Sequence, residues 1–131
     1  MKLLGRERPR IAMCGLNPHA GEHGDEDAAR IIPAIEAARA RAVLVDGPHP
    51  PDIIFLRVAR GDYDMIVAMY HDQGHIALKL LGGLSAVNIS VGLPLVRTSV
   101  AHGTAYDIAG RGIADATSLI EASRVAARLA R

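Results

Sequence analysis

Three histidines, His19, His71 and His102, each follow a short apolar run and stand in a turn that contains glycine. A neutral imidazole is a common ligand for divalent transition metals, and it can also carry protons. If the apolar runs are parallel strands, their carboxyl ends share one edge of a sheet, which is where ligands bind in open α/β sheets. The alternative for each histidine is that it caps its turn or lies in solvent.

The segment 69–75 (MYHDQGH) carries the densest polar chemistry, at the end of an apolar run. His71 and His75 are four residues apart, which places two side chains on one face of a helix, as in helical zinc motifs. The intervening Gly74 and the lack of a glutamate beside His71 favour a supporting role or a surface position for His75. Asp72 could orient an imidazole or complete the shell of a hard cation.

Three further side chains suit an anionic ligand. Arg97 offers a bidentate fork for carboxylate or phosphate, and Lys79 a mobile point charge. Two cations alone are more typical of a solvated surface. Asn88 lies inside an apolar run, where a buried amide needs partners, so we expect it to face a ligand. Asp52 follows two prolines and is explained by helix capping.

The segment 102–114 is rich in glycine but lacks the G-x-G-x-x-G dinucleotide fingerprint. It predicts a loop of small residues in which the backbone can approach a flat or phosphorylated ligand closely.

Composition narrows the class of protein. The chain has 131 residues, which predicts one domain over residues 1–131, and its apolar residues are mostly aliphatic because only 3% are aromatic. The net charge of +1, with scattered basic residues, argues against a nucleic-acid partner. No apolar run is long enough for a membrane span, and no signal peptide is evident. One cysteine, Cys14, suits a reducing cytoplasm.

Apolar runs and breakers alternate along the chain. They predict strands over residues 10–15, 42–45, 65–69, 86–91 and 96–100, and helices over 25–41, 52–60, 74–81 and from Asp115 or Thr117 to the end. The alternation favours an α/β fold with a mainly parallel sheet flanked by helices. The last helix is expected to bury one stripe of residues, Leu119, Ile120, Val125, Ala126 and Leu129.

Residues 15–22 (GLNPHAGE), 69–74 (MYHDQG) and 97–105 (RTSVAHGTA) together resemble one family. They are similar to the 4-hydroxythreonine-4-phosphate dehydrogenases of vitamin B6 biosynthesis, the PdxA family, and to catabolic relatives that act on 4-phosphorylated four-carbon sugar acids. The similarity runs from about Pro9 to the final helix. It implies one lobe of the isocitrate/isopropylmalate dehydrogenase-like fold, whose adenosine-binding loop the third stretch also resembles.

The resemblance implies roles for individual residues. His19 and His71 match two of the three histidines that hold a divalent metal (zinc, cobalt, magnesium or manganese), and Asp52 and Asp72 match acidic positions near it. The substrate contacts are matched by Lys79, Asn88 and Arg97. The reaction also needs a proton carrier, and Lys79 or Asp72 could serve as one. The residues that match the docking site for the adenosine half of NAD, with NADP not distinguished, are His102, Gly103, Thr104, Ala105 and Asp107.

The implied reaction is NAD-dependent oxidation of a secondary alcohol in a phosphorylated 3-hydroxy acid, followed by loss of carbon dioxide. The metal would act there as a Lewis acid. In the family the site lies at a dimer interface and takes ligands from both subunits, so the expected assembly is a homodimer in the cytoplasm with a small phosphorylated substrate. His75 and the segment 76–79 are more similar to the catabolic branch.

Family members are considerably longer, and their amino-terminal half carries the third metal histidine and a His-Thr pair that contacts substrate. We therefore expect this chain to match the carboxyl-terminal half, as a fragment, a truncated product, or one subunit of a split enzyme with a separate amino-terminal half. A second hypothesis is a non-catalytic module that dimerises and binds metal or nucleotide without turnover. A stand-alone isopropylmalate-type dehydrogenase is disfavoured, because carboxylates hold its metal.

Overall fold

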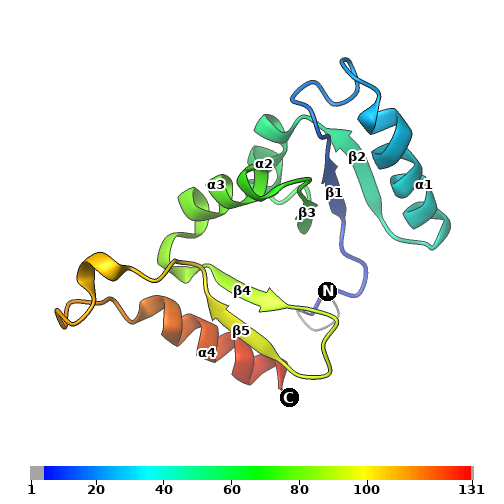
Figure 1. Cartoon of the computed structure of the whole chain (residues 1–131). Coiled ribbons are helices and arrows are strands. Elements are labelled where there is room, and N and C mark those ends of the chain that lie inside the picture. Colours follow the sequence, from blue (N-terminus) through cyan, green and yellow to red (C-terminus); the bar gives the residue numbers. More distant parts are fainter. Residues whose placement is uncertain (1–4, 131) are drawn as a thin grey trace. The chain divides into compact units, whose positions relative to one another are not determined.

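The computed structural model describes residues 5–130, and its contacts divide the chain into two compact units. One unit extends to Ala77 and the other begins at Leu78, so the boundary falls within helix α3, His71–Gly82 (Figure 1). Among the residues described, no helix is long and apolar enough to cross a membrane. The expectation of a single domain stays a prediction.

The first unit is built on a three-stranded parallel sheet in the order β2-β1-β3. The strands are β1 (Ile11–Cys14), β2 (Val45–His49) and β3 (Met65–Val67). A π-helical turn, η2 (Asp27–Ile31), leads directly into α1 (Ile32–Ala40), and α2 (Pro51–Ala59) connects β2 with β3. This parallel sheet with its flanking helices confirms the α/β class predicted from the alternating pattern.

The central strand β1 organises the core, because successive side chains of a strand point to opposite faces. On one face, Ala12 and Cys14 are fully buried against Ile54 of α2. On the other face, Ile11 and Met13 pack against the cluster formed by Ile31, Ile35 and Val45. Burial also raises the pKa of the Cys14 thiol, because desolvation disfavours the thiolate.

The second strand lies further along the chain than predicted. A strand was expected over residues 42–45 with a turn after it, whereas β2 covers Val45–His49 and pairs with β1 from Ile11 to Cys14, with an irregular register. Gly47 makes this possible: its φ is +137°, and a Cβ there would lie 2.5 Å from the Met13 carbonyl oxygen. The close approach of the two backbones therefore requires glycine at this position.

Polar side chains tie β2 to the segment that precedes β3. The Tyr63 hydroxyl donates to Asp46 Oδ2 at 2.8 Å and lies 3.2 Å from His49 Nε2. Arg39 of α1 also reaches Asp46 at 3.3 Å. The hydrogen bond from Tyr63, with smaller contributions from nearby groups, holds the pKa of the Asp46 carboxyl below its usual value.

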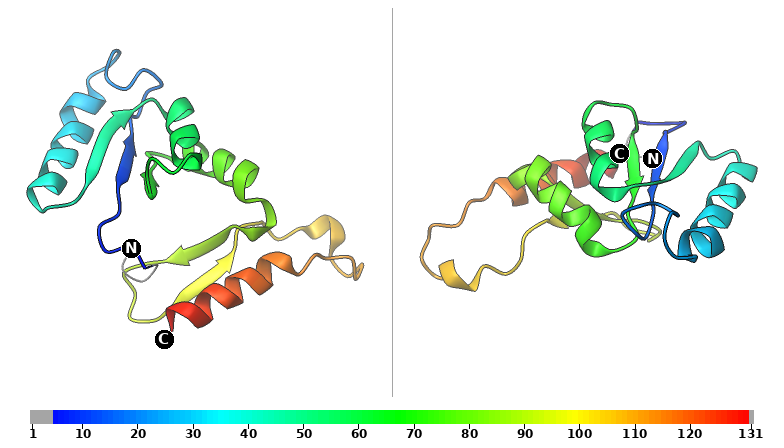
Figure 2. Two further views of the ribbon diagram at one scale, coloured as in Figure 1. Left: turned by 180° about the vertical axis from the view of Figure 1, so that it is seen from behind. Right: turned by 90° about the horizontal axis from the view of Figure 1, so that it is seen from above.

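The second unit contains an antiparallel pair, β4 (Val87–Ser90) and β5 (Arg97–Val100), with α4 (Thr117–Leu129) packed along it (Figure 2). Two short 3₁₀ turns, η3 (Gly83–Ser85) and η4 (Tyr106–Ile108), lie in the connections. Thr98 Oγ1 donates to the Ala122 carbonyl at 2.9 Å, and Ser118 Oγ donates to the Leu84 carbonyl at 2.7 Å. Small side chains on α4 allow this close packing.

Three local expectations were wrong. The helix expected after Gly74 begins at His71, so the polar cluster forms the first turn of α3. Asp52 lies in the first turn of α2 but does not cap it, since no side chain bonds the helix start at Pro50. On α4 the buried residues are Ser118 and Ala122, while Leu119 and Ile120, assigned to the buried stripe, are 62% and 47% exposed.

The first prediction concerns the close contact at Gly47. The Gly47→Ala variant should lower the free energy of unfolding by about 2–4 kcal/mol, because it adds both a backbone strain and a steric clash. The matched control is Gly61→Ala, which has φ +88° but no atom within 4 Å of the new Cβ, and which should cost only about 1 kcal/mol. Urea unfolding followed by circular dichroism compares the two, and equal losses would contradict the steric argument.

The second prediction concerns pH. Because the pKa of Asp46 is lowered in the fold, its contribution to stability is complete above the ordinary value of 3.8 and is lost as the pH falls through the lowered value. The Tyr63→Phe variant removes the largest cause, so it should lose less stability than the parent between neutral and strongly acidic pH. Urea midpoints at both pH values test this, with Tyr106→Phe, at an 83% exposed position, as control.

Candidate functional site

Gln73 brings the carboxyl ends of β1 and β3 together with the start of α3. Its Oε1 accepts the Met69 backbone N–H at 2.8 Å, and its Nε2 donates to the carbonyls of Gly15 at 3.0 Å and Leu16 at 3.4 Å. A side-chain amide three residues into a helix that bonds backward in this way resembles a capping box. The loop that carries His19 is therefore joined at its base to the turn that carries His71.

The loop after β1 is folded around Asn17. The Asn17 Oδ1 accepts the His19 N–H at 2.9 Å, and its Nδ2 donates to Glu26 Oε1 at 3.1 Å and to the His23 carbonyl. His19 Nδ1 lies 3.7 Å from Glu22 Oε2, and the His19 and His23 rings meet edge to face at 5.1 Å. The His19 side chain is 56% exposed, so its ring is accessible to a ligand.

A buried carboxylate, Asp27, also holds the loop after β1. It is 1% exposed, and its Oδ1 accepts the Leu16 N–H at 2.8 Å. Its Oδ2 is buried with no hydrogen-bond partner, and a Cβ on Gly15 would lie 2.7 Å from that oxygen. Glycine at position 15 thus lets the carboxylate approach the backbone, a role that sequence reasoning missed because Asp27 stood within an ordinary acidic helix start.

His71, Asp72 and His75 lie together on the first turns of α3. His71 Nδ1 is 2.7 Å from Asp72 Oδ1, and the His71 and His75 rings are stacked with centroids 3.9 Å apart and planes 8° apart. Asp72 therefore lies within hydrogen-bond distance of the His71 ring, and its expected role in orienting that ring stays a prediction. A histidine whose one nitrogen bonds a carboxylate keeps its other nitrogen for a metal, which is the usual arrangement around protein-bound metals.

The metal site expected at His19 and His71 stays a prediction. Among residues 5–130, no three His, Cys, Asp or Glu side chains are grouped closely enough to hold a metal ion. His19 and His71 lie in neighbouring loops at one sheet edge, whereas His102 belongs to the other unit. Each of the two histidines would offer an imidazole nitrogen, the kind of donor that suits a divalent transition metal.

In the second unit, the β4–β5 pair has one polar face. Directly opposite pairs are Asn88 with Ser99 and Ser90 with Arg97. Because Thr98 bonds α4, the alternation of the strand places Arg97 and its partners on the face away from that helix. Arg97 Nη1 donates to Ser90 Oγ at 2.9 Å. Asn88 is exposed, which corrects the expectation of a buried amide but keeps it beside Arg97.

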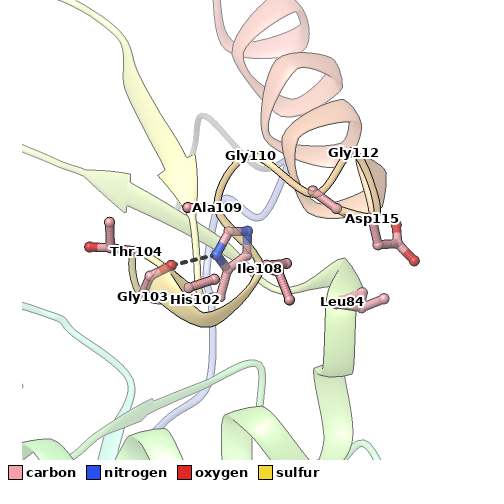
Figure 3. A pocket seen from close by; sticks show the side chains of 11 residues that line it. Leu84, His102, Gly103, Thr104, Ile108, Ala109, Gly110, Gly112 and Asp115 are labelled. Atoms are coloured by element: carbon pink, nitrogen blue, oxygen red, sulfur yellow. Dashed lines mark hydrogen bonds between the residues drawn. The ribbon is translucent and has the colours of Figure 1, made fainter.

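The glycine-rich loop after β5 and Leu84 line an open pocket of about 510 Å³ (Figure 3). Four of the five residues expected to dock NAD line it: His102, Gly103, Thr104 and Ala105. His102 Nδ1 lies 2.8 Å from the carbonyl oxygen of the next residue, Gly103, and this local contact orients the ring. Ala105 adopts a left-handed backbone, with φ +52°, where the loop enters η4.

The pocket contains a carboxylate that sequence reasoning missed. Asp107, expected to bond ribose hydroxyls, is not among the lining residues, whereas Asp115 is. Asp115 Oδ1 accepts the Thr117 N–H at 2.8 Å, and hydrogen bonds from the Thr117 side chain and backbone hold the pKa of its carboxyl low. The signal was present in the expected helix start at Asp115 or Thr117, but it suggested only capping.

Lys79 lies two turns beyond His71 on α3 and is exposed. Its expected roles in substrate binding and proton transfer stay predictions.

Comparison with known proteins identifies the family. The model of the family described as pyridoxal phosphate biosynthetic protein PdxA matches residues 1–126. The chain belongs to the PdxA family. The resemblance that three short motifs predicted is thereby confirmed over nearly the whole sequence.

Individual PdxA relatives are similar at high identity. A D-threonate 4-phosphate dehydrogenase of Cupriavidus necator is 59% identical over 99% of this chain, and a 4-hydroxythreonine-4-phosphate dehydrogenase of Desulfosudis oleivorans is 56% identical over 91% of it. The crystal structure of a 4-hydroxythreonine-4-phosphate dehydrogenase from Klebsiella pneumoniae matches 99% of this chain with a TM-score of 0.84 and 49% identity. The chain spans 40%, 36% and 40% of these three proteins, respectively.

The third prediction tests the Gln73 bridge at the base of this PdxA-family site. The Gln73→Met variant keeps the length of the side chain but leaves the Met69 N–H and the Gly15 carbonyl without their partner. It should lower the free energy of unfolding by about 1–3 kcal/mol. The control Lys79→Met removes a polar end from an exposed position of the same helix and should change stability by less than about 0.5 kcal/mol. Urea unfolding measures both, and an undisturbed Gln73→Met variant would show that the bridge is dispensable.

Proposed function

We propose that the chain supplies the carboxyl-terminal part of a metal- and NAD-dependent dehydrogenase that oxidises and decarboxylates a 4-phosphorylated 3-hydroxy acid. The observation that carries the proposal is the PdxA family match over residues 1–126. Relatives named for D-threonate 4-phosphate and for 4-hydroxythreonine 4-phosphate are both similar, so either is a candidate substrate class. The expected cellular setting is the cytoplasm.

Arg97 and Asn88 are proposed to bind the substrate. Their place on the exposed polar face of the β4–β5 pair supports this, because a guanidinium and an amide there can both donate to a phosphate or carboxylate. Ser90 holds the Arg97 guanidinium at 2.9 Å, which reduces the freedom that the side chain loses on binding. Lys79 is proposed as a further cation for the substrate and, with Asp72 as the alternative, as the proton carrier.

His19 and His71 are proposed to hold a divalent metal, with zinc, cobalt, magnesium and manganese as candidates. An ion held by these two imidazoles would supply Lewis-acid chemistry to the hydroxyl that is oxidised. Asp72 keeps the His71 ring in one orientation through the 2.7 Å contact at Nδ1. Both imidazoles are more than half exposed, so each can reach an ion without a large rearrangement of the core.

The loop pocket is proposed to bind the adenosine half of NAD, or of NADP. It suits a flat aromatic ring because glycines and alanines line most of it, including Gly103, Ala105, Ala109 and Gly110. Asp115 and Thr104 supply oxygens that can bond ribose hydroxyls. Bound there, the dinucleotide would supply the hydride acceptor for the oxidation, and these loop residues would hold and orient its adenosine half.

A homodimer is proposed because apolar side chains gather on the surface between β4 and β5. Val91, Leu93, Leu95 and Val96 are 80%, 51%, 60% and 41% exposed. An exposed apolar segment of this kind commonly marks an interaction surface. The second candidate function follows if the assembly forms but the chemistry does not: a module that dimerises and binds metal or nucleotide without turnover.

The fourth prediction tests substrate binding. Arg97→Gln should weaken the affinity for D-threonate 4-phosphate about tenfold or more, since a charged hydrogen-bond donor to the anion is lost. Arg128→Gln on α4 removes the same charge from an exposed position away from the polar face and should leave the affinity unchanged. Isothermal titration of the purified chain measures both, and NAD reduction with the same acid distinguishes an active enzyme from a binding module. Equal affinities in the two variants would remove Arg97 from the site.

The fifth prediction concerns assembly. Sedimentation velocity at a concentration on the order of tens of micromolar should give a dimer, and Leu95→Asp should shift it toward monomer, because a charge replaces buried apolar surface. The control Leu80→Asp places the same charge at another exposed leucine, on α3. A monomeric parent chain would contradict the proposed assembly, and a dimer unchanged in Leu95→Asp would move the interface elsewhere.

A further inference from the structure

His75 lies against His71 on α3, but the proposed metal site includes only His71 and His19. His71 and His75 are the first and fifth residues of α3, both are exposed, and their rings are parallel at 3.9 Å. The i, i+4 spacing lets two imidazoles on a helix reach one ion. In the stacked arrangement the in-plane lone pairs run side by side, so the two exposed rings would turn about their side-chain bonds to bind the ion together. The helix includes Gly74, so the objection that a glycine would break the helical spacing no longer holds.

The hydrogen bonds of the two rings define which nitrogens are free. His71 Nδ1 lies 2.7 Å from Asp72 Oδ1, and His75 Nδ1 lies 3.2 Å from the His71 carbonyl oxygen. Ionised carboxylate and carbonyl oxygens only accept hydrogen bonds, so Nδ1 carries the hydrogen in each neutral ring. Nε2 then has its lone pair available in both, which is the state in which a histidine ligates a metal.

The surroundings also favour a cation. Asp72 places a negative charge beside the first ring, and its side chain is 71% exposed, so it can adjust when an ion binds. Among residues 5–130, no three His, Cys, Asp or Glu side chains are grouped closely enough to hold an ion by themselves. The pair, with His19 of the neighbouring loop, would therefore leave coordination positions for water, substrate or a ligand from another chain. A site of this kind suits a catalytic ion more than a structural one.

We propose that His75 is a ligand of the same divalent transition-metal ion as His71, through Nε2 of each ring, with Asp72 as the residue that orients His71. The inference rests on the proposed metal role of His71 and deepens it, because it adds His75 where only His19 and His71 were assigned. His75 thereby becomes part of the metal shell instead of a surface residue of α3.

The test is titration of the purified full chain with Zn²⁺ and Ni²⁺, followed by calorimetry. His75→Ala should weaken binding at least about tenfold, because the second ligand no longer binds intramolecularly. A sharper variant exchanges two neighbours, His75→Ile together with Ile76→His. It keeps composition and charge but moves the imidazole to the i+5 position, and it should bind as weakly as His75→Ala. Ile76→Ala, at a 61% exposed position of α3, is the matched control.

The outcomes separate this inference from the proposed function. Loss in His71→Ala, His75→Ala and the exchanged variant supports the inference, whether or not His19→Ala also loses binding. Loss in His19→Ala and His71→Ala with parental affinity in His75→Ala overturns the inference and keeps the metal site of the proposed function. Parental affinity in all variants overturns both. Circular dichroism and thermal unfolding show that each variant keeps the fold, so a loss of binding is not a loss of structure.

Discussion

The structure of the first unit depends on how the backbone groups at the ends of two parallel strands are satisfied. Parallel strands that stop side by side leave N–H and C=O groups without ladder partners, and burying them unpaired is costly. Gln73 meets this requirement with one amide, which accepts from Met69 and donates to Gly15 and Leu16. The same bonds fix where α3 begins and hold the β1 loop against it. The positions of His19 and His71 on adjacent loops follow from that one side chain.

In the second unit, the alternation of side chains along the antiparallel pair β4–β5 separates a packing face from an exposed face. One face of β4–β5 is fastened to α4 through Thr98 and the Ala122 carbonyl, and small residues on the helix allow close contact. The other face is then free to carry Asn88 and Arg97 together. Because one face of the β4–β5 pair packs against α4, the opposite face stays available for binding.

The sequence predicted the strands near β1, β3, β4 and β5, because each is a short apolar run between breakers. It misplaced β2, since a segment with Gly47 and three prolines has the pattern of a turn. Only the absence of a Cβ at Gly47, close to Met13, shows why the segment still pairs with β1. It could not show that β4 and β5 are antiparallel, because strand direction is set by long-range pairing.

The buried face of α4 was also missed. Ser118 and Ala122 are small and polar or weakly apolar, and hydrophobicity alone favoured Leu119. The histidine motifs were recognised, whereas Asp27 and Asp115 act through contacts that no local pattern reveals.

The turn that begins α3 combines two tasks in five consecutive residues. Gln73 points inward to the strand ends, while His71, Asp72 and His75 remain exposed, and a Cβ on Gly74 would only touch Ala68 at 3.4 Å. Keeping Gln73 at the strand ends and the two histidines exposed depends on the order of these side chains around the helix, more than on the size of any one of them. An insertion or deletion of a single residue here would rotate every following side chain by about 100° and separate the bridge from the histidines at once. In evolutionary terms, the segment should tolerate changes of residue at Gly74 more readily than any change of length.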